Sequence, residues 1–270
     1  MGLRDPVSSV SHLLAAVWAV YAVLILLRIT PNRPGRRLAA VVFGGSMVLL
    51  FTASGLFHAV PFTRADQPAE FRLFQRIDQT AILGLIAGTN TPPMAALLSG
   101  AWRRWCLSGM WGLAAAGAAV LWLAPEPPHA AVVAVCLGMG WVGVLPLARY
   151  YRAVGWRAMN WVWVGGGLYT LGAVCELTDW PAGWGPPVRV GSHEVFHLLT
   201  AAASAAFFLF VARHVLPYRP PSVPGGVQAE ARSPVAEPVT AFAIQSRQQG
   251  SRSTVDCYEG RSRPPQRWAD

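Results

Sequence analysis

Two histidines, His193 and His197, stand four residues apart at the start of the last long apolar stretch of the chain. Residues at positions i and i+4 lie on one face of a helix, so both imidazoles would point in the same direction. Ser54 and His58 have the same spacing near the end of an earlier apolar stretch, and Asp78 lies at the start of the next one. Ionisable side chains are costly inside a membrane, so these residues are the first candidates for a functional site.

Three neutral imidazoles are suitable ligands for a divalent transition metal such as Zn²⁺. Catalytic zinc sites usually have three protein ligands and one open position. The predicted ligands are His58, His193 and His197. Asp78 could accept a proton from a water at the metal or orient a histidine, and Ser54 could donate a hydrogen bond to that water or to a substrate oxyanion. We therefore predict a metal centre with Asp78 and Ser54 as catalytic residues.

Each motif also has an ordinary structural interpretation. A pair of histidines at the head of a helix is often only interfacial, and a helix serine often bonds back to a carbonyl of its own helix. Asp78 could be an acid favoured by a helix N-terminus or an ion-pair partner of Arg72 or Arg76. Their joint placement favours the metal. If the apolar stretches alternate in direction, all these residues lie on one side of the membrane.

The other histidines that flank the apolar stretches are expected to lie outside the site. His12 is expected on the opposite side of the membrane from the end of the second stretch. His129 lies in a proline-rich turn, and His214 lies at the far end of the seventh stretch.

The composition is that of a membrane protein. Of 270 residues, 53% are hydrophobic and 13% are charged, whereas soluble domains have about 25% charged residues. A net charge of +9 would suggest nucleic-acid binding in a soluble protein. Here the arginines lie between the apolar stretches and in the tail, as membrane topology requires. No nucleic-acid partner is expected.

About seven apolar stretches are long enough to cross a membrane, which requires about 20 residues each. We therefore predict an all-α, polytopic membrane protein with a bundle of seven transmembrane helices in residues 1–216. Residues 217–270 are predicted to be a disordered tail rich in Pro, Ser and Arg. The predicted spans cover residues 9–27, 38–60, 77–98, 106–123, 130–147, 158–177 and 192–215.

Local sequence adds three expectations about these helices. Pro92 and Pro93 should kink or end the third helix, because proline removes a backbone donor. The residues Trp102 to Trp105 are typical of an interfacial anchor. Three glycines beginning at Gly165 would allow close helix approach, as small residues do in bilayers.

At these motifs the chain resembles the hemolysin III family, within the progestin and adipoQ receptor (PAQR) superfamily of seven-helix proteins. The matching elements follow one another in the family's order from about residue 7 to residue 215. They are Ser11-His12, Ser54 to His58, Arg76 to Ile82, Ala87 to Pro92, Tyr169 to Gly172 and His193 to His197. Gln79 and Asn90 depart from the family pattern, which frequently has a histidine and an aromatic residue there.

The resemblance implies zinc held by His58, His193 and His197, with Asp78 and Ser54 near the metal. It also implies a distant likeness to intramembrane ceramidases, and hence hydrolysis of a lipid amide or ester. One alternative is a non-enzymatic membrane-homeostasis or receptor-like protein with structural zinc, and another is a cytolytic protein, as the family name suggests.

The expected setting is the plasma (inner) membrane, with several membrane passes and with membrane lipids as partners. The arginine distribution would place the site on the outer side of this membrane, whereas the resemblance implies the cytoplasmic side.

Overall fold

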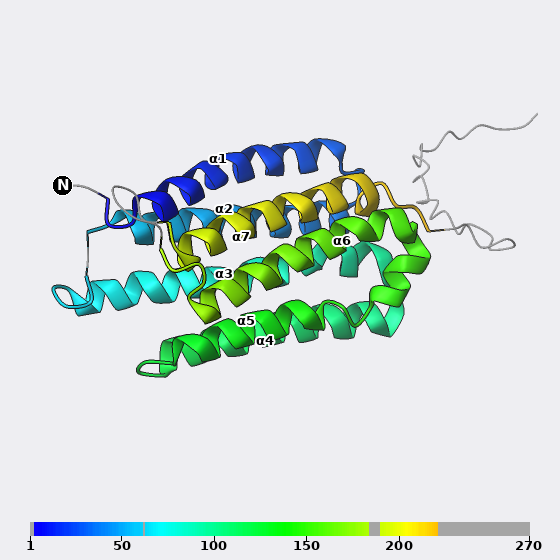
Figure 1. Ribbon diagram of the computed structural model, residues 1–270. Coiled ribbons are helices and arrows are strands. Elements are labelled where there is room, and N and C mark those ends of the chain that lie inside the picture. The colour runs from blue at the N-terminus through cyan, green and yellow to red at the C-terminus, as the bar shows by residue number, and fades with distance from the viewer. Residues whose placement is uncertain (1–2, 62, 184–189, 221–270) are drawn as a thin grey trace, which may run out of the picture. The chain divides into compact units, whose positions relative to one another are not determined.

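The chain is described by a computed structural model over residues 3–61, 63–183 and 190–220. These residues form seven α-helices (Figure 1). A π-helical turn, η1 (Val211–Val215), continues the last of them. The helices are α1 (Pro6–Ile29), α2 (Pro34–Ala59), α3 (Pro68–Leu97), α4 (Gly100–Leu123), α5 (His129–Val142), α6 (Leu147–Thr178) and α7 (Ser192–Phe210). The predicted all-α bundle of seven helices is confirmed. The tail was predicted for residues 217–270, and its residues from 221 onward lie outside the described part of the chain.

The seven helices form a closed ring. Each helix contacts the next one in the chain, and α7 returns to contact α1. Figure 1 shows α7 lying between α1 and α6, with α4 and α5 on the far side of α3 and α6. Because successive helices alternate in direction, the start of α1, the end of α2, the start of α3, the end of α6 and the start of α7 share one end of the bundle.

Three helices begin with proline in their first turn, namely Pro6, Pro34 and Pro68. Proline is suited to this position because its φ angle is already helical and the missing N–H would have no partner there. The start at Pro68 corrects the expectation that α3 begins near residue 77. The polar segment before Ile77 is helical, and Glu70 stands in its first turn, where the helix dipole favours an acid.

Two further helix starts were predicted too late. α4 begins at Gly100, so Trp102 lies inside the helix rather than in a connection. α6 begins at Leu147 rather than 158 and is broken at Gly155, whose φ of 77° is readily adopted by glycine. Of the two outcomes expected at its prolines, α3 does not end there but continues through Pro92 and Pro93 to Leu97, close to the predicted end at residue 98. Both prolines are buried in the bundle, where neighbouring helices help to accommodate them.

Small residues allow the helices near the site to approach closely. A Cβ atom at Gly44 of α2 would lie 2.4 Å from Val23 of α1. One at Gly165 of α6 would lie 2.6 Å from the ring of Phe207 on α7. The expected close approach at Gly165 is thus confirmed. These contacts hold α1 against α2 and α6 against α7, which are the four helices that carry most of the site.

Within the described part of the chain, four helices are each long and apolar enough to cross a membrane: α1, α2, α4 and α7 together with η1. A fifth span results if α5 and α6, which meet at an angle of 72°, are counted as one broken span. This pattern of apolar helices is that of a polytopic helical membrane protein.

Candidate metal centre

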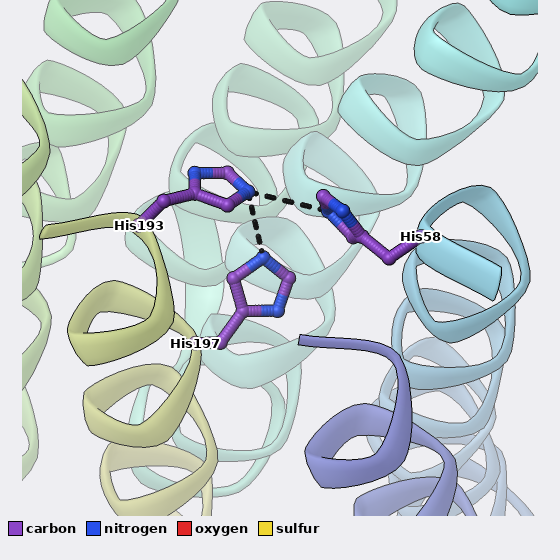
Figure 2. A group of neighbouring side chains, drawn as sticks. All are labelled: His58, His193 and His197. Atoms are coloured by element: carbon purple, nitrogen blue, oxygen red, sulfur yellow. Dashed lines mark hydrogen bonds between the residues drawn. The ribbon is translucent and has the colours of Figure 1, made fainter. Parts of the chain in front are cut away.

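Three histidines converge at one end of the bundle, as predicted. His58 lies in the last turn of α2, and His193 and His197 lie in the first turns of α7. The Nε2 atom of His193 is 3.2 Å from Nε2 of His58 and 3.1 Å from Nε2 of His197 (Figure 2). His58 and His197 are 3% and 2% exposed. The three side chains thus direct one nitrogen each toward a common point.

The first turn of α7 is capped by the side chain of Glu194. The backbone N–H of Gly191 donates to Glu194 Oε2 over 2.8 Å, and the other carboxylate oxygen of Glu194 accepts a hydrogen bond from Ser8 Oγ of α1 over 3.3 Å. Such a capping arrangement satisfies backbone donors that have no partner within the helix. It determines where α7 starts, and hence which face carries His193 and His197.

Two of the histidines bind a carboxylate through their other ring nitrogen. His58 Nδ1 is 2.8 Å from Asp5 Oδ2, and His193 Nδ1 is 3.1 Å from both carboxylate oxygens of Glu176. The hydrogen bond from His58, together with Arg4, lowers the pKa of Asp5 to about 2, although partial burial acts in the opposite direction. Asp5 is therefore ionised at neutral pH.

His12 also belongs to this end of the bundle, which corrects the expectation that it lies on the opposite side of the membrane. Its Nδ1 is 3.0 Å from His197 Nδ1, and its Nε2 is 3.3 Å from the backbone oxygen of His197. His12 lies in the second turn of α1 and is 2% exposed. Since α1 and α2 run in opposite directions, the start of α1 must lie beside the end of α2.

His129, which was expected to lie outside the site, reaches its edge. Its Nε2 is 2.9 Å from Oε1 of Glu176, the carboxylate that also binds His193. His214 lies in η1, at the other end of α7 from His193, as expected.

Two of the three nitrogen separations in the histidine cluster fit a tetrahedral metal. With bonds of roughly 2.0–2.1 Å, two imidazole nitrogens on a tetrahedral zinc ion are roughly 3.3 Å apart. The Nε2 separations of His193 from His197 and from His58, 3.1 and 3.2 Å, are close to this value, and all three candidate ligand atoms lie within 4.8 Å of one another. The histidine cluster could therefore hold a metal ion, and the three ligands would leave a fourth position open.

Ser54 and Asp78 lie beside this cluster. Ser54 is buried one turn before His58 on α2, and the Asp78 carboxyl group lies in the neighbourhood of the Ser54 hydroxyl and of His58. Oδ1 of Asp78 is buried and has no hydrogen-bond partner among the described residues. The alternative ion pair of Asp78 with Arg72 or Arg76 is not found among the described residues, where Arg72 pairs with Glu126 and Arg76 donates to the backbone oxygen of Ala124.

A cavity of about 590 Å³ extends from the histidines into the bundle. Its wall includes Ser54, Asp78, His193 and His197, and most of the remaining wall is apolar side chains from α2, α3, α5, α6 and α7. Four buried side-chain atoms have no hydrogen-bond partner in the described part of the chain, and all four belong to residues of this wall. They are Asp78 Oδ1, Thr89 Oγ1, Tyr150 Oη and Thr200 Oγ1. Since buried polar groups normally have partners, the cavity is suited to a ligand with polar groups.

Sequence reasoning missed Asp5, His12 and Glu176. The alternation of helix direction that grouped the three predicted ligands could also have predicted these residues. Asp5 and His12 lie at the start of the first helix, and Glu176 lies at the end of the sixth. Alternation places both of these ends beside the end of the second helix.

The fold and the site define a class: a polytopic helical membrane protein with a buried histidine cluster at one end of its bundle. Residues 3–208 match the family described as haemolysin-III related, and the chain belongs to this family. It is 28% identical to Hemolysin-3 of Bacillus cereus over 213 residues, which cover 78% of this chain and 91% of that protein. It is also 28% identical to the Hemolysin-3 homolog of Bacillus subtilis (strain 168) over 171 residues, which cover 63% of this chain and 74% of that protein.

Proposed function

We propose that this protein is an intramembrane, zinc-dependent hydrolase that cleaves an amide or ester bond of a lipid. The observation that carries the proposal is the convergence of three imidazole nitrogens, those of His193 and His197 at the wall of an apolar cavity, with the unpaired carboxyl oxygen of Asp78 in the same wall. An open metal position, a proton acceptor and a place for a hydrophobic substrate are then next to one another.

The residues divide the chemistry among them. A zinc ion held by His58, His193 and His197 would supply a water that ionises near neutral pH and would polarise a carbonyl group. Asp78 accepts the proton of the attacking water through its free Oδ1 and returns it to the leaving amine or alcohol. Ser54, one turn from His58, donates a hydrogen bond to the oxygen on which negative charge develops. These are the ordinary roles of a general base and an oxyanion donor.

The cavity supports a lipid as the substrate. A volume of about 590 Å³ is within the range of roughly 300–1,000 Å³ that is common for small-molecule sites. The apolar wall formed by residues such as Leu85, Val132 and Phe207 suits a hydrocarbon chain, and the polar end at the histidines suits the head of the lipid. A lipid would reach such a cavity from the membrane, which we expect to be the plasma (inner) membrane.

One specific observation favours a structural metal as the second candidate. The three candidate ligands come from two helices, His58 from α2 and both His193 and His197 from α7. A bound ion would therefore link helices at one end of the bundle even without catalysis. The name of the Bacillus relatives suggests cytolysis as another function, but the predominantly apolar cavity wall is unlike the polar lining that a water-filled pore requires.

The test is a hydrolysis assay on the purified full chain in detergent micelles. A panel of N-acyl and O-acyl lipids is incubated with protein as isolated, with protein stripped by a chelator, and with stripped protein reloaded with Zn²⁺. We expect turnover of at least one lipid by the isolated and reloaded protein and loss of turnover after stripping. Turnover that survives complete removal of the metal, or no turnover of any lipid by zinc-loaded protein, would contradict the hydrolase proposal.

A further inference from the structure

The Nδ1 atoms of the three histidines His58, His193 and His197 each contact a different side chain. Asp5 binds His58, and Glu176 binds His193, at the distances given above. The third partner is His12, whose Nδ1 faces His197 Nδ1. We call Asp5, Glu176 and His12 the outer partners. They come from the segment before α1, from the end of α6 and from α1.

The two carboxylates determine where the protons of two ligands lie. An ionised carboxylate can only accept hydrogen bonds, so Nδ1 of His58 and Nδ1 of His193 must carry the protons that are donated. A neutral imidazole has a single N–H group. The Nε2 atoms of His58 and His193 therefore present lone pairs to the common point.

The third ligand, His197, also presents the lone pair of its Nε2 atom, but its Nδ1 partner is a histidine instead of a carboxylate. The backbone oxygen of His197 can only accept, so Nε2 of His12 carries the proton donated across the 3.3 Å contact. Nδ1 of a neutral His12 is then an acceptor and receives the Nδ1–H of His197 across 3.0 Å. The Nε2 atom of His197 is again left with its lone pair. Because both nitrogens of His12 are used in this way, His12 is not a fourth ligand.

Three lone pairs that face one another within 4.8 Å repel each other unless a cation lies between them. A proton on one Nε2 would satisfy only part of the cluster, since one N–H group can point directly at only one of its two neighbours. A divalent metal satisfies all three at once. The two carboxylates also place negative charge one imidazole ring away from the ion. This charge favours a cation, because the membrane interior offers little solvation.

We infer that Asp5, Glu176 and His12 are positioning residues that fix the tautomer and orientation of the three histidines for a metal ion. The inference rests on the metal site of the proposed function but not on hydrolysis. Groups that hold the far side of a ligating histidine typically contribute a factor of about 10–100 in metal affinity. Here each of the three candidate ligands has one outer partner at its Nδ1 atom.

The experiment measures the zinc affinity of the full chain in detergent, by competition with a fluorescent chelator, for Asp5→Ala, Glu176→Ala and His12→Leu. We expect each variant to bind zinc about 10–100-fold more weakly than the wild type. Two matched controls should retain wild-type affinity: Glu126→Ala, which removes an exposed acid paired with Arg64, and His214→Leu, which removes the histidine of η1.

Conservative variants separate positioning from a general effect on folding. Asp5→Asn and His12→Asn retain an oxygen that can accept the Nδ1–H of the ligand, so both should recover most of the affinity lost in Asp5→Ala and His12→Leu. The visible spectrum of the Co²⁺-loaded protein should be that of a tetrahedral site in the wild type and should change in the Ala and Leu variants. A variant that simply misfolds would lose helical content. In that case the zinc affinity of the Asn variant at the same position tests the positioning role.

Three results would overturn the inference. They are wild-type zinc affinity in all three outer-partner variants, equal losses in the Asn variants and their Ala or Leu counterparts, or no zinc binding by the wild type. The last result would also remove the metal from the proposed function. Weakened zinc binding without any lipid hydrolysis would support this inference and contradict only the hydrolase.

Discussion

The histidine cluster and the cavity beside it differ in how their polar atoms are satisfied. In the cluster, the Nδ1 atoms of His58, His193 and His197 all have a partner within 3.1 Å. In the cavity wall, polar atoms such as Asp78 Oδ1 and Tyr150 Oη have no partner in the part of the chain that the structure describes. The cluster could therefore hold a metal ion, whereas the cavity suits a ligand with polar groups.

The largest effect should follow from removing a ligand of the cluster. His193→Ala should reduce bound zinc from about one ion per chain to near zero, because two imidazoles cannot complete a stable zinc site in which three protein ligands are usual. The measurement is the metal content of purified protein by mass spectrometry. His214→Ala, at the other end of α7, is the control and should keep its zinc. Full zinc occupancy in His193→Ala would show that the three histidines do not form the metal site.

The second effect separates the cavity wall from the cluster. Asp78→Asn should lower kcat for lipid hydrolysis by about 10²–10⁴-fold, as loss of a general base does, while bound zinc stays at the wild-type level. The amide has the shape of the carboxyl group but cannot take the proton. Parallel assays of turnover and metal content test this prediction. Equal loss of zinc and turnover would mean that Asp78 is a ligand rather than a base.

A smaller effect is expected from filling the cavity without touching the cluster. Gly166 lines the cavity, and an added Cβ there meets nothing within 4 Å. Gly166→Leu should lower kcat/KM for a long-chain lipid by about tenfold, because the side chain occupies space intended for the substrate. Gly138→Leu is the matched control, since Gly138 is equally open and does not belong to the cavity wall. If both variants keep wild-type kcat/KM, the cavity is not the lipid site.

The smallest effect concerns an unpaired hydroxyl. Tyr150→Phe should stabilise the lipid-free protein by about 1 kcal/mol, because a buried hydroxyl without a partner is costly and its removal relieves that cost. The measurement is the free energy of unfolding of delipidated protein. A loss of stability of similar size would show that the hydroxyl has a partner, and the contrast between cluster and cavity would then be weaker.

The sequence was sufficient for the bundle and for the three inward-facing histidines. The spacing of His193 and His197 determines a shared helix face, and helix alternation brings His58 to the same end. These inferences depend only on helix geometry and on the length of a membrane span. They therefore survived errors of several residues in the helix boundaries.

The parts that were missed depend on local backbone geometry or on consistent use of the alternation. The start of α3 at Pro68 and the break of α6 at Gly155 are not visible in an apolar pattern, because both segments are polar or mixed. His12 was placed at the wrong end although alternation puts it beside His58. Asp5 looks like an ordinary acid before a helix, and its role becomes visible only from its contact with His58.

The most direct test of the metal centre is X-ray absorption at the zinc edge on the purified wild-type protein. We expect about three imidazole nitrogens at roughly 2.0–2.1 Å and one further light atom in the open position. A coordination shell without imidazole, or with sulfur ligands, or the absence of zinc from the purified protein, would contradict it.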